Sequence, residues 1–372
     1  MYKTIENLKL GKEFTFLPNK KIPIYNWFYY KEGFSRGLVY EILTNSNLKK
    51  SSTVLDPFCG SGTTLLASKE LGFNAIGFDV MPISILTSKV KTENYDIKKL
   101  QNYKVKLFSH KFQKPNRIPK NLKKWFSRYT LEDILFFRPI IDEIEDRKIR
   151  DFFKLALITS SIKCSYIFKD GSVLKIRKKP TPPLKLMFKR TVKKMINDLK
   201  KFPKTKSKII VNFGDARNLN VDDESVDIVI TSPPYLNKIE YKNIYRIENE
   251  LFFREVSKPP IRSFFGLRRE ENFEIKKIIG NYDVNALAYF NDINMSLKEI
   301  YRVLKKDSKA HIVVGDALIG EKIIDVLNIT AKLSERIGFE VEKIIIGNKR
   351  IATTPQRIKI GTLREGMIII KK

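Results

Sequence analysis

Short runs rich in β-branched residues alternate with amphipathic stretches toward both ends of the chain. Five of these runs predict strands, at Thr53–Leu55, Ala75–Asp79, Lys208–Phe213, Val226–Thr231 and His311–Gly315. Between them, apolar residues recur at three- and four-residue spacings, as expected of helices, at Gly62–Leu71 and Ala286–Leu304. Strands that alternate with helices favour a doubly wound, mainly parallel sheet, so the expected fold class is α/β.

The middle of the chain has a different pattern. Amphipathic helical spacing dominates there, at Leu131–Ile144, Ile149–Tyr166 and Leu184–Leu199. We therefore expect an α/β core formed by residues 1–90 and 205–372, with a mostly helical insertion at 91–204. Two apolar runs near the C-terminus, Phe339–Ile346 and Met367–Lys371, predict an antiparallel hairpin at the edge of the sheet.

The distribution of charge separates the same two parts. The 372-residue chain carries 71 Lys and Arg against 41 Asp and Glu, a formal net charge of +30. Residues 85–204 hold 32 of the basic residues and 11 of the acidic ones. Such a surplus indicates a polyanionic partner, and nucleic acid is the first candidate, although any single lysine is as easily part of a solvated face. The expected contacts are Lys175, Arg177, Lys178 and Lys179 in the insertion, and Arg262, Arg268 and Arg269 in a second segment.

Composition excludes several classes of protein. Hydrophobic residues make up 42% of the chain, too many for a mainly disordered protein. No apolar run approaches the roughly 20 residues of a membrane-spanning helix, and the N-terminus lacks the apolar core of a signal peptide. Two cysteines, Cys59 and Cys164, provide no disulfide framework, and two histidines make a His-rich metal site improbable. We therefore expect a cytoplasmic protein without a bound metal.

The first candidate motif is VLDPFCGSGTT at Val54–Thr64, which predicts a strand, a glycine turn and a helix. Glycines in such a turn let the backbone approach a ligand closely, and free N–H groups at a helix N-terminus attract a carboxylate or phosphate. Asp79 ends the next predicted strand, where an acidic residue commonly binds ribose hydroxyls. A tight strand-to-helix connection without a ligand is the alternative interpretation.

The second candidate motif is TSPPY at Thr231–Tyr235, at the end of another predicted strand. Two consecutive prolines cannot continue a central strand, so the chain must leave the sheet in a stiff conformation. That stiffness would hold the Ser232 hydroxyl and the Pro233 carbonyl as acceptors for both hydrogens of a planar exocyclic amino group. Accepting both hydrogens would localise the lone pair of the nitrogen, and Tyr235 would stack on the base. A simple Pro-Pro loop end is the alternative.

Together, the two motifs resemble those of the amino-group methyltransferases that use S-adenosylmethionine. The resemblance implies a Rossmann-like core and S-adenosylmethionine as the cofactor. The positions it assigns to the cofactor are Asp56, Phe58, Gly60, Ser61, Gly62 and Thr63 around the methionine, Asp79 and Val80 at the ribose, and Asp215 and Ala216 at the adenine. Those it assigns to catalysis are Ser232, Pro233, Pro234 and Tyr235. The segments 25–31 and 34–43 resemble the family's N-terminal helix, an ordinary core helix being the alternative.

The serine of TSPPY indicates the target atom. Serine is typical of members that methylate cytosine N4, whereas aspartate is commoner in adenine-N6 enzymes. We therefore expect direct methyl transfer to the N4 amino group of a cytosine that is turned out of duplex DNA. The alternatives are an RNA enzyme acting on cytidine N4, for example in ribosomal RNA, an adenine-N6 DNA methyltransferase, and a non-catalytic nucleic-acid-binding protein. The cofactor motif precedes the catalytic one, the reverse of many cytosine-N4 enzymes, and the sequence does not determine the target site or a companion nuclease.

Overall fold

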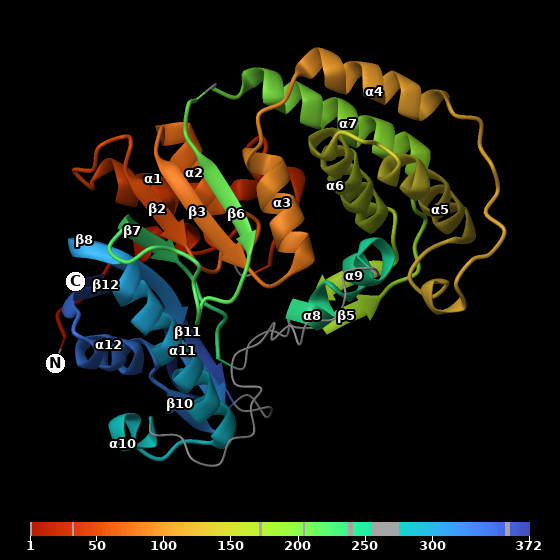
Figure 1. Ribbon diagram of the computed structural model, residues 1–372. Helices are drawn as coiled ribbons and strands as arrows, with labels where there is room; N and C mark the ends of the chain where they lie inside the picture. The colour runs from red at the N-terminus through yellow and green to blue at the C-terminus, as the bar shows by residue number, and fades with distance from the viewer. Residues whose placement is uncertain are drawn as a thin grey trace.

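The computed structural model describes residues 2–31, 33–170, 173–203, 205–236, 241–253, 275–353 and 358–372. Its centre is an eight-stranded sheet with the strand order β1-β11-β12-β8-β7-β2-β3-β6 (Figure 1). The strands span β1 Thr4–Glu6, β2 Thr53–Asp56, β3 Asn74–Asp79, β6 Ile209–Phe213, β7 Val226–Thr231, β8 Leu304–Gly315, β11 Glu340–Thr353 and β12 Lys359–Lys371. Strands β6, β3, β2, β7 and β8 are parallel, and β12 runs antiparallel to both of its neighbours. This is a doubly wound, Rossmann-like α/β fold, as predicted.

Helices cover both faces of the sheet. Alternate strand residues point to opposite faces, so Val54 packs with one helical layer and Leu55 with the other. The first layer contains α1 Arg36–Thr44, α2 Thr63–Leu71 and α3 Pro82–Thr92. The second contains α11 Val284–Val303 and α12 Val326–Ile337. Strands β2, β3, β6 and β7 and helices α2 and α11 thus lie within two residues of their predicted positions, whereas β8 begins at Leu304 rather than at the predicted His311.

The predicted C-terminal hairpin is present, but its position and length differ from the prediction. Its strands β11 and β12 are 14 and 13 residues long and pair antiparallel. The short strand β1 pairs parallel with β11 on its outer side, so the hairpin does not form the edge of the sheet. A three-residue strand with exposed side chains has too little apolar alternation to be recognised from sequence.

The segment between α3 and β6 is mostly helical (Figure 1). It contains α4 Ile97–Ser109, α5 Arg128–Asp142, α6 Arg147–Lys163 and α7 Leu184–Lys201, together with an antiparallel hairpin of β4 Ile167–Asp170 and β5 Val173–Ile176. The hairpin was not predicted, and it carries part of the basic run 175–179. After β7 follow the short helices α8 Tyr241–Ile244, α9 Arg246–Phe252 and α10 Lys276–Ile279, and a small hairpin of β9 Ala317–Ile319 and β10 Lys322–Ile324 follows β8.

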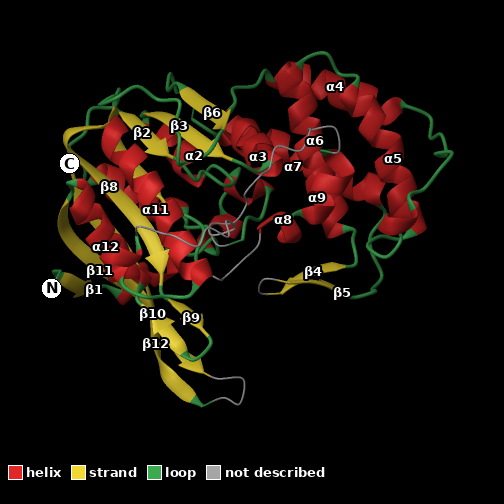
Figure 2. Cartoon of the chain, turned by 60° about the horizontal axis from the view of Figure 1, so that its bottom comes forward, coloured by secondary structure: helices red, strands yellow, loops and turns green. Residues whose placement is uncertain are grey.

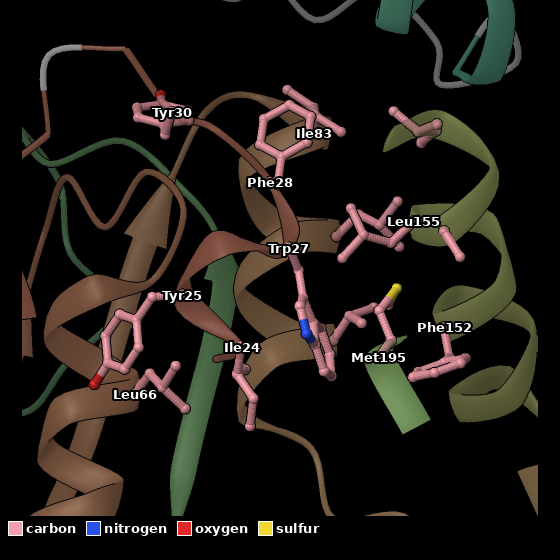
Figure 3. Packing of buried hydrophobic residues seen from close by; sticks show 14 of the residues in the cluster. Ile24, Tyr25, Trp27, Phe28, Tyr30, Leu66, Ile83, Phe152, Leu155 and Met195 are labelled. Carbon is pink, nitrogen blue, oxygen red and sulfur yellow. The ribbon is translucent and has the colours of Figure 1, made fainter. Parts of the chain in front are cut away.

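The inserted helices share one hydrophobic cluster with the first layer of the core. The N-terminal segment joins the two parts: Tyr25 points toward α2, whereas Trp27 points toward Phe152 and Met195 of the inserted helices (Figure 3). The Trp27 indole also donates a hydrogen bond of 2.9 Å to Asp198 of α7. The insertion is therefore anchored to the core by a buried aromatic side chain and a hydrogen bond. None of the described helices is long and apolar enough to cross a membrane.

Candidate active site

A cavity lies at the carboxyl edge of the sheet, where β2, β3 and β7 end. This edge is the usual ligand site of doubly wound sheets. The cavity wall contains most of the predicted site residues, namely Asp56, Phe58, Gly60, Ser61, Thr63, Asp79, Val80, Asp215, Ala216, Ser232 and Pro234. The fold thus brings the two sequence motifs, which are far apart along the chain, into the wall of one cavity.

The turn between β2 and α2 needs glycine at two positions. Gly60 and Gly62 have φ angles of 50° and 79°, in the left-handed region that favours glycine. A Cβ atom at Gly60 would lie 2.9 Å from the ring of Tyr30, which lines the same cavity. At Gly62 it would lie 2.8 Å from Ser88 Oγ. Tyr30 and Ser88 therefore pack tightly against the turn, and the N-cap residue of α2 is Gly62, so no side chain caps the free N–H groups of the first turn.

Asp56 joins the glycine turn to strand β7. Its buried carboxylate accepts hydrogen bonds from the Phe58 backbone N–H at 3.1 Å, from the Thr64 hydroxyl at 2.6 Å and from the Thr231 hydroxyl at 2.7 Å. Burial raises the pKa of Asp56 to about 6 against the opposing effect of these donors. Because Thr231 precedes Ser232, the carboxylate of Asp56 holds the two motifs in fixed relative positions.

Asp79 closes the other side of the glycine turn. Its carboxylate accepts hydrogen bonds from the backbone N–H of Gly60 at 3.0 Å and from that of Met81 at 2.7 Å. Burial raises the pKa of Asp79 to about 6, and the nearby Asp56 carboxylate adds to the rise. A carboxylate held by two backbone donors at the end of β3 is fixed in orientation and borders the cavity.

An arginine that the sequence analysis did not identify lies beside Asp215. The Arg217 guanidinium donates to the Asp215 carboxylate, with Nε 2.9 Å from Oδ1, and to Asp292 of α11 at 2.8 Å. Arg217 also lines the cavity, and its hydrogen bond to Asp215 raises its pKa, so it remains charged. The sequence shows that Arg217 is two residues from Asp215, but it does not show that Arg217 also binds Asp292 of α11.

The N-terminal segment contributes Tyr30, Gly33 and Phe34 to the cavity wall. The Tyr30 ring stacks on that of Tyr245, with centroids 5.2 Å apart, and its hydroxyl accepts a hydrogen bond from Ser84 at 3.2 Å. The segment that precedes α1 is therefore part of the site. Helix α1 begins at Arg36, so the helix predicted over 34–43 is present but starts two residues later than predicted.

The TSPPY loop is held by the neighbouring strands. The Ser232 hydroxyl donates a hydrogen bond of 3.1 Å to the carbonyl of Val313 on β8. The Tyr235 hydroxyl donates one of 2.9 Å to Glu365 of β12, and its ring lies so close to Gly315 that a Cβ there would be 3.2 Å away. Pro233 borders a small apolar space behind the loop, between the sheet and α11. Since its hydrogen is directed at Val313, Ser232 presents its oxygen lone pairs as acceptors.

The remaining predicted residues lie outside the cavity. The basic residues of 175–179 lie on β5 and in the chain that follows it. Arg262, Arg268 and Arg269 fall outside the described residues. Within the described part of the chain, no group of three or more His, Cys, Asp or Glu side chains is placed to hold a metal ion.

Comparisons with known proteins give matches to DNA methyltransferases. A family model described as DNA methylase matches residues 10–89, which include the glycine turn and Asp79. The chain is 25% identical to the Type II methyltransferase M.BsoBI of Geobacillus stearothermophilus over 99% of this chain and 92% of that protein. It is also 25% identical to the Type II methyltransferase M.AvaI of a Nostoc species, over 89% of this chain and 82% of the relative.

A methyltransferase of known structure from Methanosarcina mazei, which depends on S-adenosylmethionine, shares 12% identity, with a TM-score of 0.34 over 90% of this chain and 97% of that one. The DNA methylase family model supports S-adenosylmethionine as the cofactor of this chain. The sequence matches confirm the predicted resemblance to the amino-group methyltransferases.

Proposed function

We propose that this protein transfers the methyl group of S-adenosylmethionine to the N4 amino group of cytosine in DNA. The observation that carries the proposal is the shared cavity, in which Ser232 and Pro234 of the catalytic loop face the glycine turn and Asp79. The relatives that match along most of the chain are named Type II methyltransferases, and the matching family model is a DNA methylase. Both support DNA as the methylated polymer.

The residues of the cavity fit the cofactor. Its ribose hydroxyls need an acceptor, which the fixed Asp79 carboxylate provides, and its methionine part would lie against the glycine turn, where Gly60, Ser61 and Thr63 line the cavity. Asp215 and Ala216, on the side of the cavity that follows β6, are assigned to the adenine. When bound, S-adenosylmethionine would supply a methyl group carried on a positively charged sulfur; the sulfur would leave as a neutral thioether, and the methylated nitrogen would lose one proton to water.

The protein's part in the reaction is to position the amino group. Ser232 Oγ accepts one amino hydrogen, because its own hydrogen is bound by Val313, and the Pro233 carbonyl accepts the other. Two acceptors in the base plane localise the nitrogen lone pair and direct it at the methyl group, so orientation accounts for the rate acceleration. Duplex DNA must present the target base turned out of its stack to reach this cavity.

The serine supports cytosine over adenine, and two further functions remain as alternatives. An RNA cytidine-N4 methyltransferase would use the same loop, and an adenine-N6 enzyme would use the same fold.

To test which polymer is methylated, the protein is incubated with S-adenosylmethionine labelled in its methyl group and with equal masses of duplex DNA or structured RNA. Label in DNA at least tenfold above RNA supports the proposal, and label in RNA alone overturns it.

The hairpin of β4 and β5 supports a role in DNA binding for the basic run after it. Lys175 lies on β5, and Arg177, Lys178 and Lys179 are exposed just beyond this strand. In both views, the hairpin lies on the same side of the molecule as the carboxyl ends of the parallel strands (Figures 1 and 2). A basic segment there would contact the phosphates that flank a base in the cavity.

Replacing Lys175, Arg177, Lys178 and Lys179 by Gln is expected to make DNA affinity less sensitive to salt. Each lost phosphate contact lowers the log–log slope of affinity against salt concentration by about 0.9. Affinity for S-adenosylmethionine should not change, since the cavity lies elsewhere. Fluorescence anisotropy with a labelled duplex at several salt concentrations measures the slope. A quadruple variant with the wild-type slope would show that these side chains are only a solvated face.

Cofactor binding is expected to weaken in acid because Asp79 must be ionised to accept from the ribose. Its pKa in the free protein is raised to about 6, so the carboxylate is increasingly protonated as the pH falls through 6. The dissociation constant should rise about tenfold per pH unit below that value and be constant above pH 7. Calorimetry between pH 5 and 8, in two buffers of different ionisation enthalpy, would also detect proton release on binding. A constant affinity over this range would contradict the role of Asp79.

A further inference from the structure

Strands β11 and β12 continue as a free two-stranded ribbon beyond the rest of the sheet. The pairing between β12 and β8 begins at Glu365 with Gly315, so residues 348–353 and 358–364 pair only with each other within the sheet. The ribbon leaves the sheet at the carboxyl end of β8, the edge that carries the cavity. Figure 2 shows it extending away from the body of the molecule, with β9 and β10 beside it.

The two faces of this ribbon differ. On one face, Ala352 and Leu363 are buried, and a Cβ at Gly361 would lie 2.6 Å from Ile323 of β10. On the other side, Ile351 stands opposite Thr362 and Thr353 opposite Lys359, all of them exposed. The side chains of Ile351 and Ile358 are 64% and 65% exposed, which is unusual for isoleucine. One face therefore packs on the protein, and the other is available to a partner.

The charge of the ribbon is entirely positive. Its described residues include Lys349, Arg350, Lys359 and Arg364 and no acidic residue. Arg364 pairs with Asp316 at 2.7 Å and Lys349 pairs with Glu6. Within the described part of the chain, no acidic side chain pairs with Arg350 or Lys359. Arg350 alternates with Ile351 and so projects from the opposite face of the strand, whereas Lys359 stands opposite Thr353. The ribbon as a whole thus carries two exposed cations together with exposed aliphatic and threonine side chains, a combination complementary to a polyanion that also displays methyl groups.

The base of the ribbon touches the catalytic loop. Glu365, the residue at which the ribbon joins the sheet, accepts the 2.9 Å hydrogen bond from Tyr235. Its other oxygen accepts from Asn348 at 2.8 Å, and Asn348 also donates to the Gly11 carbonyl at 2.9 Å. The ribbon is thereby fixed relative to TSPPY at both of its strands. A partner that presents a base to the cavity lies within reach of the ribbon.

We propose that the β11–β12 ribbon docks in a groove of duplex DNA beside the target base. This proposal rests on the proposed function. The major groove is about 12 Å wide and admits a two-stranded ribbon, and strands about 4.8 Å apart fit that width. At about 3.4 Å per residue, the strand over 358–364 reaches roughly 24 Å from the catalytic loop. On the exposed face, Ile351 contacts thymine methyl groups, and Arg350 on the opposite face and Lys359 near the end of the ribbon contact phosphates.

The first test removes the two unpaired charges in the Arg350→Gln/Lys359→Gln variant. Its matched control is Lys49→Gln/Lys306→Gln, which removes two exposed lysines before β2 and near the start of β8, at the opposite edge of the sheet. The ribbon variant should bind a labelled duplex at least about tenfold more weakly, with a log–log salt slope shallower by about 1.8. Cofactor affinity should not change in either variant, and the control should keep the wild-type DNA affinity.

The second test detects contact directly and does not depend on the loss of affinity. Both native cysteines are buried, so the Ile351→Cys variant offers an accessible thiol for a photoreactive cross-linker. Illumination with duplex DNA should give a covalent adduct that excess unlabelled duplex suppresses, and a Lys306→Cys variant treated alike should give none. If the wild type methylates DNA but the ribbon variant binds normally and no adduct forms, the ribbon proposal alone is overturned. If the wild type methylates only RNA, the proposed function itself is overturned, whatever the ribbon variants show.

Discussion

Replacing Ser232 by alanine is expected to slow methyl transfer about a hundredfold to a thousandfold, the range found when one group that stabilises a transition state is removed. The Ser232 hydroxyl gives its hydrogen to Val313 and accepts one from the amino group, so alanine removes an acceptor needed to localise the lone pair. Affinity for S-adenosylmethionine should change little. Single-turnover kinetics with labelled cofactor and duplex DNA measure the chemical step directly.

The Ser232→Thr variant is the control for this prediction. Threonine keeps the hydroxyl and its hydrogen bond to Val313 but adds a methyl group, so it should retain far more of the rate than alanine. Since Ser232 is only partly buried, neither change should lower stability greatly. If the alanine variant transfers methyl groups at the wild-type rate, TSPPY is not the catalytic loop. If both variants are equally slow, the loop is sensitive to shape and the hydroxyl is not the essential group.

Replacing Asp79 by alanine is expected to weaken S-adenosylmethionine binding by about 1.5–3 kcal/mol, or roughly tenfold to a hundredfold. The change removes the acceptor for the ribose and also frees the backbone N–H groups of Gly60 and Met81, so the glycine turn loses support. Isothermal titration calorimetry with S-adenosylmethionine measures the loss. Thermal unfolding without cofactor separates this effect from a loss of stability.

Asp222→Ala is the matched control for Asp79, because Asp222 is exposed and does not line the cavity. It removes the same charge and should leave cofactor affinity unchanged. An Asp79→Ala variant that unfolds normally and binds S-adenosylmethionine as tightly as the wild type would remove Asp79 from the cofactor site.

Local sequence patterns predicted the part of the fold that holds the site. Strands β2, β3, β6 and β7 begin and end within one residue of the predicted runs, because each run is β-branched and bounded by turn residues. The glycine turn was recognisable for a similar reason: left-handed φ angles at Gly60 and Gly62 restrict those positions to glycine. Each of these patterns, the strand runs and the glycine turn, lies within a stretch of about ten residues and can be recognised without knowledge of the fold.

Contacts between distant residues were not predictable from such patterns. Glu365, which binds Tyr235, is 130 residues away in the sequence, and Asp292 is 75 residues from Arg217. Glu365 lies on β12 and Asp292 on α11, and nothing in the sequence of either element marks these carboxylates as partners of the site. Asp56 was assigned to the cofactor, but its oxygens are bonded to Phe58, Thr64 and Thr231, an arrangement that only the packed sheet reveals.

The central claim is that the amino group of cytosine in DNA receives the methyl group. The most direct measurement is mass spectrometry of nucleosides from a methylation-free duplex DNA after incubation with the protein and S-adenosylmethionine. N4-methylcytosine should appear with the wild type and be nearly absent with Ser232→Ala. N6-methyladenine in its place would keep the fold and the cofactor site but contradict the assignment of Ser232 to cytosine. DNA without any methylated base would contradict the proposed function itself.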